Sequence, residues 1–145
     1  MNTIVCNTLS GAVSEYTRHD FDSVTATHCA GVDGLFAFGG DNDAGLSITT
    51  ELRLPATLRE NTLKQQIAMV YLSMRGQGEA RFTVFGPGQS WSYPFPLRDS
   101  DQTRCPVGKG IRENYLGFGL STPDGQAFTL DRVEVMSVKS KTRRV

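Results

Sequence analysis

Apolar and polar residues alternate with a period of two along most of the chain, as in β-strands that bury one face. In segment 80–85, for example, Phe82 and Val84 share one face. Segment 46–54 has four apolar residues of one parity: Leu46, Ile48, Leu52 and Leu54. The pattern predicts an all-β protein with strands over 3–8, 12–18, 22–28, 34–38, 46–54, 66–74, 80–85, 90–94, 114–120, 128–133 and 134–138.

Turn residues separate several of these segments. Gly86-Pro-Gly-Gln89 and Thr122-Pro-Asp-Gly125 each predict a hairpin, because proline presets a turn and glycine accepts positive φ. Gly39–Gly45 is a third loop. A change of parity near Asp131 predicts a β-bulge within the last strands.

One segment is ambiguous. Residues 56–74 follow Pro55, contain Asn61 as a possible helix cap, and have apolar residues at helical offsets, so a short helix stays open. Residues 67–74, however, are apolar on both faces, as in a central strand of a sandwich. We therefore favour a strand there.

The 145 residues fit one domain, and the chain has no internal repeat or linker-like segment. Two packed antiparallel sheets are the expected way to bury the alternating faces. The prediction is one β-sandwich or jelly-roll-like domain over residues 1–145, with an extended basic tail at 139–145.

Charge and composition exclude some partners. The 15 basic and 15 acidic residues cancel, which gives no reason to expect nucleic acid or a membrane surface as partner. No apolar run approaches the ~20 residues that a spanning helix needs, and no signal peptide is recognisable. Cys6, Cys29 and Cys105 are widely spaced and odd in number, which favours reduced thiols and synthesis in a cytoplasm.

The best metal candidates are Asp41 and Asp43, which flank Asn42 in the Gly39–Gly45 loop. Closely spaced carboxylates and amides suit calcium, but the other ligands of a calcium loop are missing and the same residues favour tight turns. The cysteines and histidines lack the spacing of a zinc site. We therefore expect a turn, with no metal and no cofactor.

Catalytic chemistry has weak support. His19, Asp20 and Asp22 lie close in sequence and serines are plentiful, but no nucleophile motif accompanies them. We expect that the protein is not an enzyme, with no catalytic residues. A hydrolase acting on cell wall or glycan stays a third alternative.

Trp91 and Tyr93 share a parity, and we expect them to be exposed. Exposed aromatic rings can stack on sugars, whereas rings at the edge of a sandwich core are the structural alternative. The pair is therefore a candidate ligand-binding site for a carbohydrate.

Two charged segments are candidate interaction sites. The tail carries Lys139, Lys141, Arg143 and Arg144, and is either a solvated end or a docking tail for acidic residues of a neighbouring subunit. Arg112 and Glu113 lie beside apolar residues and are the second candidate contact between subunits.

Four segments carry a resemblance that spans nearly the whole chain. They are Asn2–Tyr16, Gly34–Gly45, Gly110–Phe118 and Ser140–Val145, and together they resemble a group of small structural proteins of tailed bacteriophages. The resemblance implies a repeated virion component of the tail or baseplate, made in the host cytoplasm. Its expected partners are copies of itself and other virion proteins.

The resemblance assigns a role to no residue, so other functions on the particle stay open. One is a module that binds a carbohydrate or receptor, with a host surface glycan as ligand. Another is a capsid decoration or head–tail joining protein.

Overall fold

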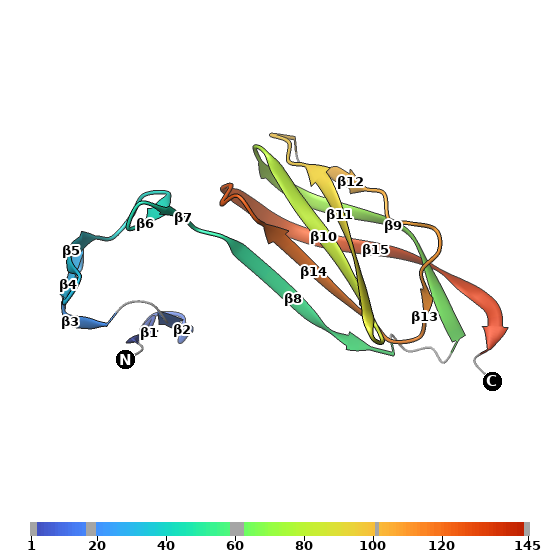
Figure 1. Cartoon of the computed structure of the whole chain (residues 1–145), viewed down its shortest axis with the longest axis horizontal. Helices are drawn as coiled ribbons and strands as arrows, with labels where there is room; N and C mark the ends of the chain where they lie inside the picture. The colour runs from blue at the N-terminus through green and yellow to red at the C-terminus, as the bar shows by residue number, and fades with distance from the viewer. Residues whose placement is uncertain (1–2, 17–19, 59–62, 101, 144–145) are drawn as a thin grey trace. The chain divides into compact units, whose positions relative to one another are not determined.

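The computed structural model describes residues 3–16, 20–58, 63–100 and 102–143. Strands and turns make up this part of the chain, in which no residue is helical, so the prediction of an all-β protein is confirmed (Figure 1). The described residues include no helix long and apolar enough to cross a membrane. The ambiguous segment contains strand residues on both sides of 59–62, and the possible cap Asn61 lies outside the described residues.

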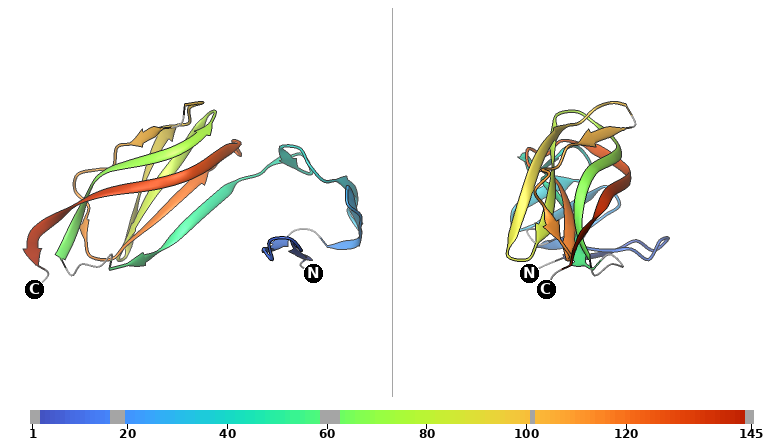
Figure 2. Two further views of the ribbon diagram at one scale, coloured as in Figure 1. Left: turned by 180° about the vertical axis from the view of Figure 1, so that it is seen from behind. Right: turned by 90° about the vertical axis from the view of Figure 1, so that its right-hand side faces the viewer.

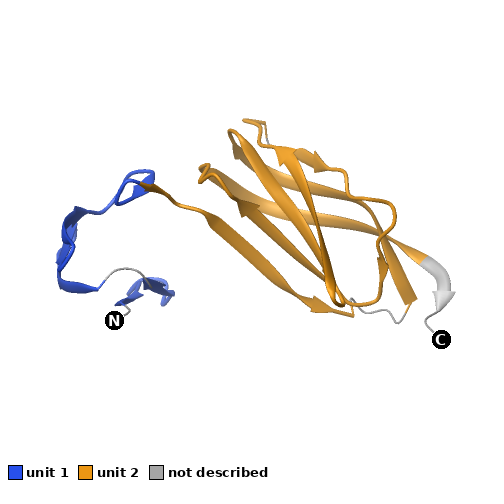
Figure 3. Ribbon diagram, in the orientation of Figure 1, with its two compact units in different colours: residues 1–45 blue, residues 46–145 orange. Residues whose placement is uncertain are grey.

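The chain divides into two compact units, residues 1–45 and residues 46–145 (Figure 3). The sequence predicted one sandwich over residues 1–145. The sandwich instead lies in residues 46–145, and the first 45 residues form small separate sheets. We call these parts the N-terminal unit and the sandwich unit.

The first sheet of the sandwich unit has four antiparallel strands in the order β11-β10-β14-β8. In the second sheet, β9 pairs with β12 and β13 along one edge and with β15 along the other. The end-on view in Figure 2 shows the two layers. The strands are β8 (Thr50–Thr57), β9 (Leu63–Gly76), β10 (Glu79–Gly86), β11 (Gln89–Pro96), β12 (Thr103–Cys105), β13 (Arg112–Glu113), β14 (Leu116–Thr122) and β15 (Phe128–Arg143).

The core lies between the inner faces of these sheets. Alternate residues of β9, β10 and β14 point into it, as their period of two predicts. The rings of Phe82 and Phe118 stack at 5.8 Å between centroids. Further buried members are Ile67, Val70, Leu72, Met74, Ala80, Val84, Phe95, Cys105, Ile111, Leu116 and Leu120.

The two predicted hairpins have different outcomes. Gly86 pairs with Gln89, so β10 and β11 form a hairpin around Pro87-Gly88, and Gly88 has the positive φ of 76° that the turn needs. The turn at 122–125 is also present, with Gly125 N–H donating to the Thr122 carbonyl at 3.2 Å. It joins β14 to β15 in different sheets, however, so the prediction of a hairpin there is wrong.

The last strand is longer than predicted. The two segments 128–133 and 134–138 form one strand, β15, whose register shifts between Leu130 and Arg132, and this confirms the bulge. Lys139 pairs with Gln65 and Arg143 with Leu63, so residues 139–143 continue the sheet and are not a separate tail. Arg144 lies outside the described residues.

The N-terminal unit contains a hairpin of β1 (Thr3–Cys6) and β2 (Val13–Tyr16), and a sheet of β3 (Phe21–Val24), β4 (His28–Gly31) and β5 (Gly34–Ala37). The predicted strand 22–28 is wrong, because Thr25 turns the chain there. Its hydroxyl accepts from the His28 N–H at 3.0 Å. At the junction of the units, β6 (Asn42–Asp43) pairs with β7 (Leu46–Ser47) around Ala44-Gly45. The predicted strand 46–54 is interrupted between β7 and β8.

Candidate functional site

The N-terminal unit buries almost nothing. Among its described residues only Cys29 is buried, at 4% exposure. Its exposed large apolar residues are Ile4, Val5, Leu9, Val13, Tyr16, Val24, Val32, Leu35 and Phe38. Monomeric proteins rarely leave so dense a set of apolar side chains in water, so this surface is a candidate contact site.

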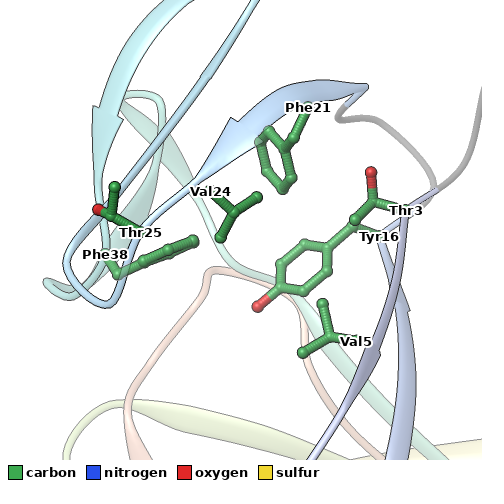
Figure 4. Close-up of a pocket in the computed structure, with 7 residues that line it drawn as sticks. All are labelled: Thr3, Val5, Tyr16, Phe21, Val24, Thr25 and Phe38. Carbon is green, nitrogen blue, oxygen red and sulfur yellow. The ribbon is translucent and has the colours of Figure 1, made fainter.

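Part of this surface forms a hollow of about 420 Å³ between the β1–β2 hairpin and the β3–β4–β5 sheet (Figure 4). Three aromatic rings follow one another along its wall. The ring centroid of Tyr16 lies 6.0 Å from that of Phe21, and the centroid of Phe21 lies 6.5 Å from that of Phe38. The other lining residues are Thr3, Val5, Val24 and Thr25.

The chemistry of the hollow favours a protein side chain over a small polar ligand. None of its seven lining residues carries a charge, and its polar side-chain groups are hydroxyls. Small-molecule sites usually add convergent polar or charged groups that fix the ligand's orientation. The arrangement suits an apolar side chain of a partner protein.

A second uncovered apolar surface lies on β8, at the edge of the first sheet. Leu52 pairs with Leu120 and Leu54 with Phe118, and residues paired across strands share one face of a sheet. Leu120 and Phe118 are buried at 3% and 6% exposure, whereas Leu52 and Leu54 are 43% and 42% exposed. The inner face of the first sheet therefore continues onto β8, but its apolar side chains there are exposed to solvent.

The width of the two sheets explains this exposure. The first sheet is four strands wide, and the second is three wide because β12 and β13 both lie on the same side of β9. β11 lies near β12, and the Cys105 thiol lies 3.9 Å from the Tyr93 carbonyl oxygen. With those edges aligned, none of the described strands of the sandwich unit lies opposite the inner face of β8, and β15 pairs with β9 alone among them, which leaves its other edge free.

Charge divides the chain in the same place as the fold. Residues 1–45 contain six acidic residues and one basic residue, a net charge of −5. Residues 46–145 contain nine acidic and fourteen basic residues, a net charge of +5. The net charge of the whole chain is zero, so this asymmetry can be recognised in the sequence only when the boundary at Gly45 is known.

The predicted metal candidates lie at the junction of the units. Asp41 and Asp43 are exposed, and Asp43 belongs to β6 of the small hairpin. In the part of the chain that the structure describes, no three His, Cys, Asp or Glu residues gather as metal ligands would. Of the catalytic candidates, Asp20 and Asp22 are exposed and His19 lies outside the described residues.

Trp91 and Tyr93 do not lie as predicted. Both are half-buried on β11 and pack against the core, because Trp91 pairs with Val84 and Tyr93 with Phe82 on the inner face. The Trp91 ring lies so close to Gly86 that a Cβ there would meet it at 3.0 Å. The expectation that both rings are exposed is wrong, and carbohydrate binding stays a prediction.

The remaining candidates lie on the second sheet. Arg112 and Glu113 form β13 and pair with Gln66 and Gln65 of β9. Lys139 pairs with Gln65 from the other side, on β15. The structure thus brings both predicted interaction segments to the same end of β9, although the sequence placed them far apart. Lys141 and Arg143 follow Lys139 in β15.

The comparisons with known proteins add no relative. No family model, curated protein or solved structure matches the chain.

Proposed function

We propose that the protein is a structural subunit of a tailed-phage virion, in the tail or baseplate, that assembles with copies of itself and with other virion proteins. The observation that carries the proposal of assembly is the N-terminal unit, in which nine large apolar side chains are exposed and one described residue is buried. The resemblance of the sequence to tailed-phage structural proteins supports the virion as its setting.

The size of the N-terminal unit strengthens the argument. Segments below about 40 residues usually need disulfides, metals or oligomerisation to be stable, and this unit is barely longer. Its cysteines, Cys6 and Cys29, are both free. A partner surface that covers the apolar residues would supply the missing stability, and a subunit of a large assembly has such a surface available.

The test of the virion setting is the protein content of purified particles. Particles banded on a density gradient should contain the chain in many copies when quantified by mass spectrometry against the major capsid protein. An abundant host cytoplasmic protein, depleted by the same steps, is the control. A chain that is depleted together with that host protein would rule out a structural place in the virion.

A further inference from the structure

The free edge of the sandwich unit is basic at one end. β15 pairs only with β9 among the described strands, and its last five residues include Lys139, Lys141 and Arg143. Because the two sheets align along β11 and β12, this edge lies on the same side of the sandwich as β8, where Leu52 and Leu54 are uncovered. A partner that fits this surface is acidic, exposes apolar side chains and can add a strand to an open sheet.

The N-terminal unit has all three properties. Its net charge is −5, with exposed carboxylates at Asp22 and Asp33 among others. It exposes nine large apolar residues, and β1 and β5 each pair with one strand only among those that the structure describes. Opposite charge steers association and suppresses wrong partners, while burial of apolar area supplies affinity.

The path of the chain favours a second copy as the source of this unit. A Cβ at Gly125 would lie 2.7 Å from the Ser47 Cβ atom, so the chain enters the sandwich unit beside the turn that precedes β15. Lys139 lies eleven residues along β15 from Phe128, roughly 35 Å away at the usual rise of a strand. The attachment point of the N-terminal unit and the basic end of β15 are therefore at opposite ends of the sandwich.

We propose that the N-terminal unit of one copy docks on the free edge of β15 and on Leu52 and Leu54 of β8 in a second copy. Such a contact joins two different surfaces, so it repeats from copy to copy and produces a closed ring or an open filament. This inference deepens the proposed function, since it names the partner and the surfaces of the assembly.

Isotope mixing distinguishes contacts between copies from contacts within one. Unlabelled and ¹⁵N-labelled full-length chains are mixed, and a zero-length carbodiimide cross-linker joins carboxylates to lysine amines. We expect cross-linked peptides between residues 1–45 and Lys139 or Lys141 that combine both isotopes. Cross-links of a single isotope only would show that the unit packs on its own sandwich, and would overturn the proposal.

Charge reversal tests the pairing directly. We expect Asp22→Lys with Asp33→Lys to weaken self-association about tenfold in sedimentation, and Lys139→Glu with Lys141→Glu to do the same. Mixing the two variants should restore association, because each then supplies the charge that the other lacks. Glu79→Lys with Asp99→Lys, at exposed sites of the sandwich unit, is the matched control and should change little.

The proposal fails if the wild-type chain stays monomeric at all concentrations, or if the control weakens association as much as the paired variants. Trp91 fluorescence and the unfolding midpoint establish that the sandwich unit of each variant is folded. Recovery of association in the mixture shows that the N-terminal unit of the Asp22, Asp33 variant is intact. These results are independent of the particle analysis. A chain that is abundant in virions but monomeric in solution would refute this contact and leave the proposed function standing.

Discussion

The two units of this protein follow the same local rules and reach opposite results. Both consist of antiparallel strands with alternating polarity, joined by turns that use Asn, Thr, Pro and Gly as expected. In the sandwich unit two sheets face each other and bury a common core. The described strands of the N-terminal unit do not build such a core among themselves, and Cys29 is the one buried residue among those described.

The difference shows that strand formation and core formation are separate steps. The β1–β2 hairpin is well specified locally: Asn7 Oδ1 accepts hydrogen bonds from the Leu9 N–H at 2.9 Å and the Ser10 N–H at 3.1 Å. A lone hairpin is nevertheless marginally stable in water, because it buries little apolar area to offset its conformational entropy. We therefore expect the N-terminal unit, unlike the sandwich unit, to need a partner surface for its stability, as the proposed assembly would provide.

Hydrogen exchange should give the largest contrast between the units. In dilute protein we expect amides of β9 and β10 to exchange only through global unfolding, with protection of roughly 10³-fold or more, and amides of β1–β5 to exchange nearly freely. Mass-resolved exchange across a concentration series measures both. Strong protection of β1–β5 in a verified monomer would contradict the expected difference in stability between the two units.

Core truncation should affect the two units unequally. Phe82→Ala removes a ring that is 1% exposed, and we expect it to lower the free energy of unfolding by about 3–5 kcal/mol. Phe38→Ala, at a ring that is 44% exposed, should leave the unfolding of the sandwich almost unchanged in dilute protein. Denaturant titration followed by the fluorescence of Trp91, the single tryptophan, reports both. Equal losses would mean that the units unfold together.

Alkaline pH should weaken the sandwich through one buried thiol. Burial raises the pKa of Cys105 from 9.0 to about 11. Above pH 9 the unfolded chain releases this proton while the folded chain retains it, so stability falls as pH rises and levels off above about 11. The expected loss is at most about 3 kcal/mol.

The Cys105→Ala variant isolates this effect from other groups that titrate in the same range. Its free energy of unfolding, measured from pH 8 to about 11, should fall less steeply than that of the wild type. Cys6→Ala, which removes an exposed thiol of the N-terminal unit, is the matched control and should keep the wild-type slope. Identical slopes for all three proteins would show that Cys105 does not cause the loss of stability at alkaline pH.

Two glycines provide the smallest and most closely matched test. Gly11 and Gly88 have nearly equal positive φ, 72° and 76°, and neither has an atom within 4 Å of an added Cβ. Alanine at either position should cost about 1 kcal/mol of backbone strain. Only Gly88→Ala should shift the Trp91-monitored unfolding midpoint of dilute protein. A shift for Gly11→Ala as well would show that the hairpin contributes to the same cooperative unit.

Local pattern was sufficient to predict much of the sandwich unit. Alternation of apolar and polar residues identified β10 with its inward side chains and the bulge beside Asp131, and turn residues identified the Pro87-Gly88 turn. Each of these features depends on neighbouring residues alone. It missed β12, whose three residues have too little sequence to show a period. It also misjudged the turn at 122–125, because a hairpin and a crossover between sheets use the same turn residues.

The sequence by itself determined the all-β class and most strand positions, whereas the division of charge became visible only with the boundary between the two units. Only the tertiary structure decided which apolar faces are covered. Leu52 and Leu120 belong to one continuous face, yet their exposure differs because the second sheet is one strand narrower than the first. Burial depends on what lies opposite a residue, and that is set by the pairing of distant strands, which a period of two does not encode.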